Sequence, residues 1–185
     1  AAAETVRVRV TDAGNVPYDG IRVHGSAAPE ARLSQAGGLV ELAREATGGL
    51  SAHVEGSAPL TADGIVNAAS FVPGLSPGGF AAIFGSGLAA AAEGGLPPYP
   101  ADTGGVGVWI DGRPAGLHYA SATQVNLVVP ERAGAGTRDV FVSSAGGSAV
   151  LLRRSVDEAA PGIFAVVRNR NFLEIYCTGL GSNLS

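Results

Sequence analysis

Short apolar segments that alternate with turn residues constrain this chain more than any other feature of its sequence. In the second half, seven such segments have the composition of β-strands. They lie at residues 80–84, 106–110, 117–119, 125–129, 140–142, 150–152 and 163–167. Glycine and proline turns such as Asp111-Gly112 and Pro161-Gly162 separate them. Seven short strands in about 100 residues are typical of an immunoglobulin-like β-sandwich.

The first third of the chain repeats this pattern on a smaller scale. Residues 6–10 alternate valine with polar residues, and residues 21–24 alternate again after a turn-rich loop, so the two segments are expected to form a hairpin. Residues 39–46 have some helical spacing but are short and bounded by glycines, which favours a strand. Residues 50–54 alternate once more.

The predicted fold is therefore all-β, with two tandem immunoglobulin-like β-sandwich domains. Residues 1–62 form a small immunoglobulin-like domain, and residues 63–171 form the sandwich with the seven strands. A polar linker of small residues at 56–64 joins them. Residues 172–185 remain as a terminal strand that belongs to a further or neighbouring domain.

An apolar strand that runs into a Gly-Leu turn occurs twice in the sequence. Residues 83–89 read I-F-G-S-G-L-A, and residues 175–181 read I-Y-C-T-G-L-G. Enough sequence for a whole sandwich follows the first copy, whereas four residues follow the second. Because a strand cannot bury its side chains alone, we expect the second copy to be unpaired and to seek a partner by strand addition. The side chains expected at this subunit interface are Phe172, Leu173, Ile175, Tyr176 and Cys177.

Composition excludes several classes of function. The net charge is −4, so no basic surface favours nucleic acid, and no apolar stretch is long enough to predict a transmembrane helix. All 12 basic residues are arginine, which excludes Schiff-base chemistry on lysine. Cys177 is the single cysteine, so no intrachain disulfide is available.

Patterns for catalysis are weak. Residues 74–78 match the G-x-S-x-G elbow of hydrolases, in which the residue after the serine donates its backbone N–H to the oxyanion. Here that residue is Pro77, which has no N–H, so a turn before a strand is the favoured interpretation. No phosphate-binding loop occurs. We predict no catalytic residue and no cofactor.

Patterns for metal or sugar binding are also weak. The histidines His24, His53 and His118 lack metal-ligand spacing and are expected on polar strand faces. Four aspartates could supply oxygens to calcium near the domain junction, but ordinary turn-forming aspartate is favoured, and we predict no metal site. They are Asp63, Asp102, Asp111 and Asp157. Trp109 lies between Val108 and Ile110 and is expected on the opposite face of their strand. It could form a sugar platform with Tyr99 and Tyr119, but a core or interdomain role is favoured.

An ordered series of motifs gives a family resemblance over residues 64–185. The motifs are G-I-V-N-A-A-S-F at 64–71, P-G at 73–74, S-P-G at 76–78, I-F-G-S-G-L at 83–88, Q-V-N-L-V-V-P at 124–130, A-P-G-I-F at 160–164 and Y-C-T-G-L-G at 176–181. This segment resembles the Solibacter-type C-terminal domain of exported proteins from Acidobacteria. The resemblance implies IPT/TIG-like sandwiches, with a second sandwich expected after residue 181. Residues 1–62 resemble bacterial Ig-like (Big-type) domains more weakly.

These features predict a non-enzymatic structural protein of the bacterial cell exterior or cell surface. The expected role is a subunit of a surface filament or array that assembles head to tail by β-strand addition, with copies of itself as partners. The alternative is an adhesin or carbohydrate-binding module of a larger exported protein, with cell-surface glycans as partners.

Overall fold

The computed structural model describes residues 4–11, 15–26, 28–44, 49–57 and 60–181, and it confirms the all-β class. Strands, turns and loops account for all of these residues, and no helix that could span a membrane occurs among them. Each of the seven segments predicted between residues 80 and 167 forms a strand.

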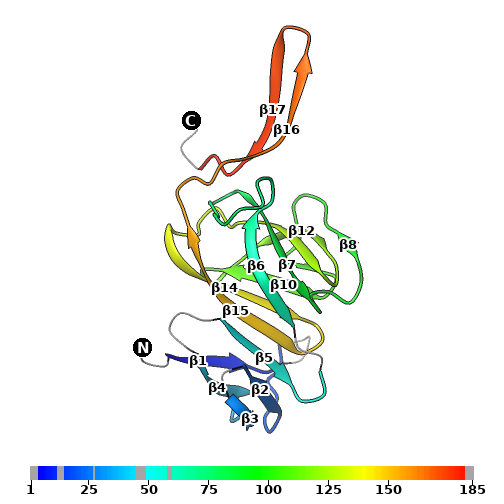
Figure 1. Cartoon of the computed structure of the whole chain (residues 1–185). Coiled ribbons are helices and arrows are strands. Elements are labelled where there is room, and N and C mark those ends of the chain that lie inside the picture. The colour runs from blue at the N-terminus through cyan, green and yellow to red at the C-terminus, as the bar shows by residue number, and fades with distance from the viewer. Residues whose placement is uncertain (1–3, 12–14, 27, 45–48, 58–59, 182–185) are drawn as a thin grey trace.

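Two antiparallel sheets face each other in the middle of the molecule (Figure 1). The five-stranded sheet runs in the order β6 (Thr61–Asn67), β7 (Phe80–Ser86), β13 (Gln124–Val128), β12 (Gly116–Ala120), β8 (Glu93–Gly94). The eight-stranded sheet runs in the order β11 (Arg113–Pro114), β10 (Val106–Ile110), β14 (Gly136–Ser144), β15 (Ser148–Val156), β5 (Leu50–Val54), β2 (Arg22–Gly25), β3 (Ala28–Leu33), with β9 (Asp102–Thr103) also paired to β10.

Alternating side chains from both sheets fill one core. Ile83 of β7, Val108 of β10, Leu127 of β13 and Val142 of β14 have no exposed surface. Their neighbours in sequence point the other way, as the twofold period of a strand requires. The two sheets therefore form a β-sandwich, and its core joins strands that are far apart in the chain.

The N-terminal segment continues the sheet of the sandwich. β5 pairs with β15, with Leu50 opposite Leu151, and β2 pairs with β5. The boundary predicted near residue 62 is thus crossed by one continuous sheet. β6 begins at Thr61, within the segment predicted as a linker, and a bulge near Asp63 accommodates its turn-forming residues.

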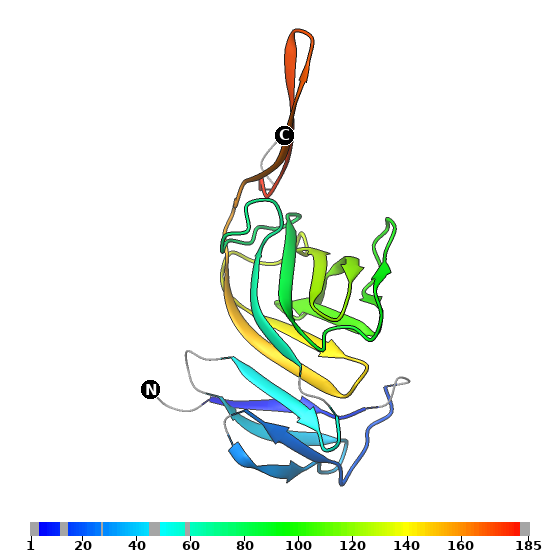
Figure 2. The same ribbon diagram turned by 45° about the vertical axis from the view of Figure 1, so that its right-hand side comes forward.

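The predicted hairpin between residues 6–10 and 21–24 is wrong. β1 (Glu4–Arg9) pairs instead with β4 (Leu39–Arg44), while β2 pairs with β3 and β5. The β1–β4 ribbon covers the outer face of the eight-stranded sheet, where Val40 and Leu42 form a second core with Leu50 (Figure 2). β1 therefore pairs with the strand that lets its apolar face pack on the eight-stranded sheet, and not with the next strand in the sequence.

The last two strands leave the sandwich. Among the described strands, β16 (Gly162–Asn169) and β17 (Phe172–Thr178) pair with each other alone, and they project as a hairpin from one end of the molecule (Figures 1 and 2). β17 is therefore not the unpaired strand expected from the sequence. The segment 163–167, predicted as the seventh strand of the sandwich, provides its partner. We call β16 and β17 the terminal hairpin.

Candidate functional site

The terminal hairpin exposes an unusual number of large apolar side chains. Eight of them are between 45% and 61% exposed. They are Ile163, Phe164, Val166, Val167, Phe172, Leu173, Ile175 and Tyr176. Large contiguous apolar surfaces of this kind mark interaction sites on soluble proteins.

Both faces of the hairpin carry large apolar side chains, and each also carries one charged residue, Arg168 on one face and Glu174 on the other. Val166 lies opposite Ile175, and Leu173 shares their face because it is two residues from Ile175. Phe172 and Tyr176 point to the opposite face. An ordinary half-buried strand has one polar face, so a hairpin with two apolar faces fits a position between two layers of protein.

Four of the five side chains predicted for the subunit interface lie on the open part of this hairpin. Phe172, Leu173, Ile175 and Tyr176 are each more than half exposed. Cys177 differs, because it is half-buried and lines a hollow at the base of the hairpin. The sequence therefore identified the apolar strand, but it missed the equal contribution of β16.

Hydrogen bonds tie the base of the hairpin to the sandwich. The backbone N–H of Phe80 donates to Thr178 Oγ1 at 2.7 Å, and the N–H of Ala160 donates to the carbonyl of Gly179 at 2.8 Å. The side-chain amide of Asn67 donates to the carbonyl of Ala160 at 2.7 Å. The aromatic ring of Phe164 also packs edge-on against that of Phe80. These contacts fix the direction in which the hairpin leaves the sandwich.

The motifs that carry the family resemblance meet at this base. Asn67 belongs to the first motif, Ala160 to the A-P-G-I-F motif, and Thr178 with Gly179 to the last. Ser76 of the S-P-G motif is 2% exposed, and its hydroxyl has no hydrogen-bond partner among the described residues.

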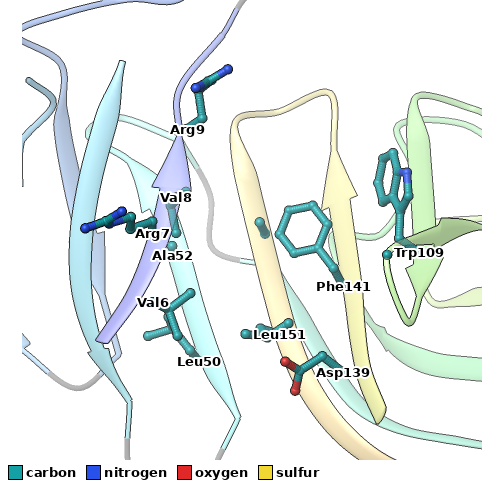
Figure 3. Close-up of a pocket in the computed structure, with 12 residues that line it drawn as sticks. Val6, Arg7, Val8, Arg9, Leu50, Ala52, Trp109, Asp139, Phe141 and Leu151 are labelled. Atoms are coloured by element: carbon teal, nitrogen blue, oxygen red, sulfur yellow. The ribbon is translucent and has the colours of Figure 1, made fainter. Parts of the chain in front are cut away.

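A second feature, an apolar cleft, lies between β1 and the outer face of the eight-stranded sheet (Figure 3). Its open volume is about 510 Å³. Val6 and Val8 form one wall, and Leu151, Phe141 and Trp109 line the other side. We call this feature the β1 cleft.

Trp109 lies on the opposite face of β10 from the buried Val108 and Ile110, as the alternation predicted. Its ring packs against Phe141, with centroids 5.5 Å apart and planes tilted by 48°. Tyr99 instead contacts Phe80 and His118, so it does not join Trp109 in the sugar platform that was considered as the less favoured alternative.

Asp139, at one end of the β1 cleft, belongs to a charge cluster (Figure 3). Arg44 of β4 is 1% exposed, and it forms salt bridges with Glu4 at 2.7 Å and Asp139 at 3.3 Å. Arg153 of β15 reaches the same two carboxylates at 3.0 and 3.2 Å. Because Glu4 is on β1 and Asp139 on β14, the cluster joins the β1–β4 ribbon to the sheet beneath it.

The cluster changes the acid–base behaviour of Glu4. The hydrogen bond from Arg44 is the largest cause and lowers the pKa of the Glu4 carboxyl, although partial desolvation opposes it. Burial works to lower the pKa of Arg44, but the hydrogen bond with Glu4 and the charge of Asp139 outweigh it and raise that pKa. Both groups are therefore held in their charged forms.

The histidines and aspartates considered for metal binding are dispersed. No group of three His, Cys, Asp or Glu side chains with metal-binding geometry occurs among the described residues. The sequence did miss one contact: His24 and His53 are cross-strand neighbours whose rings stack with centroids 5.1 Å apart. Only the β2–β5 pairing brings them together, so no spacing in the sequence could have indicated it.

Comparisons with known proteins give no assignment: no protein-family model matches the chain, and no curated protein matches it.

Proposed function

We propose that this protein is a structural subunit that assembles with copies of itself through the terminal hairpin. The observation that carries the proposal is the exposure of eight large apolar side chains on both faces of β16 and β17. An isolated two-stranded hairpin is marginally stable in water, and one with two apolar faces gains further from cover by protein.

The size of the apolar surface supports a protein partner. With about half of each of eight large side chains exposed, the hairpin presents an apolar area on the order of 800 Å², which is what one partner contributes to a standard interface. Covering half of it would contribute about 10 kcal/mol before the cost of association. That is enough for a specific complex.

The position of the hairpin supports head-to-tail assembly. It projects from one end of the molecule, while the β1–β4 ribbon lies at the other (Figure 1). A projecting donor that docks on a different surface of the next copy makes a heterologous contact, and such contacts propagate as open chains unless they close into a ring. A surface filament or array at the cell exterior is the role that we propose.

The proposal is tested by the size of the purified protein in solution. We expect the wild-type chain to form oligomers or filaments by light scattering and electron microscopy. The double variant Leu173→Asp/Ile175→Asp should be monomeric, because charge on the hairpin face opposes its burial. Leu96→Asp is the matched control, since Leu96 is 83% exposed but lies outside the hairpin.

Two results would contradict self-assembly. One is a wild-type chain that stays monomeric at high concentration. The other is an assembly that the hairpin double variant leaves intact while circular dichroism shows that the variant is folded. The Leu96→Asp control separates an effect of the hairpin from a general effect of surface charge on solubility.

A binding module for glycans is the second candidate, favoured by the position of Trp109 in an open cleft beside Phe141. Saturable binding to a polysaccharide that Trp109→Ala abolishes would support it. A glycan array without any saturable binding would count against it.

A further inference from the structure

We infer that the β1 cleft is the acceptor for the terminal hairpin of the next copy, so that hairpin and cleft are the two halves of one heterologous contact. This inference rests on the proposed self-assembly and names the surface that completes it. Both halves belong to the same chain, so an assembly built this way needs no other protein.

The chemistry of the cleft matches that of the hairpin. Val6 and Val8 on β1 face Leu151 of the underlying sheet across the cleft, and Phe141 lies beside Leu151 on the neighbouring strand (Figure 3). The open volume of about 510 Å³ holds several apolar side chains but not a complete hairpin. We therefore expect the part of the hairpin nearest its tip, with Phe172 and Leu173, to enter between β1 and the sheet.

The placement of the two surfaces suits an open chain. The hairpin projects beyond the five-stranded sheet, and β1 crosses the opposite part of the molecule (Figures 1 and 2). A subunit can therefore donate its hairpin and accept another at the same time. The subunits of such a chain need not be related by a twofold axis, which distinguishes this arrangement from a closed dimer.

One charge on each surface can meet its opposite in this pairing, although the hairpin also carries Arg168 and Arg170. Glu174 is the only carboxylate of the terminal hairpin. Arg9 lies at the mouth of the cleft and, within the part of the chain that the structure describes, forms no salt bridge, whereas the neighbouring Arg7 is bound by Glu41 at 3.0 Å. We expect Arg9 of one copy to meet Glu174 of the next.

The first test separates donors from acceptors. Leu173→Asp/Ile175→Asp removes the donor, and Ala149→Trp fills the cleft from the outer face of β15, where Ala149 lines it. Each variant alone should be monomeric, and an equimolar mixture should form a heterodimer and nothing larger. Ser155→Trp is the matched control, because Ser155 is exposed on the same strand and does not line the cleft.

The outcomes distinguish the inference from the proposed function. If Ala149→Trp still forms filaments while the donor variant is monomeric, the hairpin assembles through another surface and the cleft assignment is overturned. If the mixture yields no heterodimer although both variants are folded, the assignment is also overturned. A wild-type chain that is always monomeric overturns both proposals.

A charge exchange provides a second test that does not fill the cleft. Arg9→Glu or Glu174→Arg alone should weaken assembly about tenfold, because like charges then meet at the contact. The combined variant Arg9→Glu/Glu174→Arg should recover most of the wild-type assembly. Additive weakening in the combined variant would overturn the pairing of these residues and, with it, the proposed seating of the hairpin.

Discussion

The two copies of the apolar strand and Gly-Leu turn have the same local structure and opposite surroundings. Gly87 and Gly179 both adopt left-handed backbone, with φ of 67° and 74°. Yet Ile83 and Leu88 of the first copy have no exposed surface, whereas Ile175 and Leu180 of the second are 55% and 46% exposed.

This comparison shows that the strands around the motif, and not the sequence of the motif itself, decide whether its side chains are buried. β7 lies between β6 and β13 and faces a second sheet, so its core-facing side chains, such as Ile83, are fully covered. Within the described residues, β17 pairs with β16 alone and no second sheet faces it. The same sequence pattern therefore stabilises the fold in one place and presents a surface in the other.

The largest expected effect comes from truncating the same residue of the motif in each copy. Ile83→Ala should lower the free energy of unfolding by about 3 kcal/mol, because it removes buried methylenes and leaves a cavity. Ile175→Ala should change the stability of the monomer by less than about 0.5 kcal/mol. Denaturant unfolding of dilute protein measures both, and equal effects would break the comparison.

Substituting the glycines of the two turns should give a somewhat smaller difference in the free energy of unfolding. Gly87→Ala forces a side chain into left-handed backbone, which costs about 1 kcal/mol. Gly179→Ala should cost about 2 kcal/mol, because its new methyl group would also overlap the carbonyl of Ala160. Hydrogen exchange should show faster opening at the hairpin base in Gly179→Ala alone. Equal exchange in the two variants would contradict the anchoring role.

The charge cluster around the buried Arg44 can be compared with an exposed ion pair of the same ribbon. Arg44→Leu should lower stability by about 2 kcal/mol, because Glu4 and Asp139 each lose one of their two arginine partners. Arg7→Leu removes an ion pair whose side chains are 74% and 55% exposed, and it should cost less than about 1 kcal/mol. Thermal unfolding of the two variants compares these losses of stability. A larger loss in Arg7→Leu would show that the cluster does not attach the β1–β4 ribbon to the sheet.

The smallest expected effect is a pH dependence at Glu4. Because the folded state lowers the pKa of this carboxyl, its contribution to stability is fully present above the ordinary pKa of glutamate. The contribution disappears as the pH falls through the lowered folded value. Wild type and Glu4→Gln should therefore differ in melting temperature at neutral pH and converge in acid. A difference in melting temperature that grows in acid would contradict the lowered pKa of Glu4.

Local pattern was enough to predict most strands, the sandwich core and the exposed apolar residues of β17. Val108 and Ile110 were placed on one face and Trp109 on the other because alternation needs no knowledge of partners. The strand at Thr61–Asn67 was missed because its Asp63 and Gly64 are turn formers, which a bulge accommodates.

The candidate site could be predicted only in part. The apolar residues of β17 were evident, but β16 was assigned to the sandwich because its composition is that of any buried strand. The β1 cleft combines residues as distant as Val8 and Phe141. Its existence depends on the β1–β4 pairing, which the sequence did not indicate.

The sequence by itself determined the all-β class, the positions of most strands and turns, and the abundance of apolar side chains on the last strand. These follow from backbone preferences and from the twofold period of a strand, which act over a few residues. Only the tertiary structure decided which strands pair, that the N-terminal strands extend the sandwich sheet, and that β16 and β17 leave it. The physical reason is that an apolar strand face can be buried against any of several layers of protein. Which layer covers it is therefore decided by the packing of the whole fold.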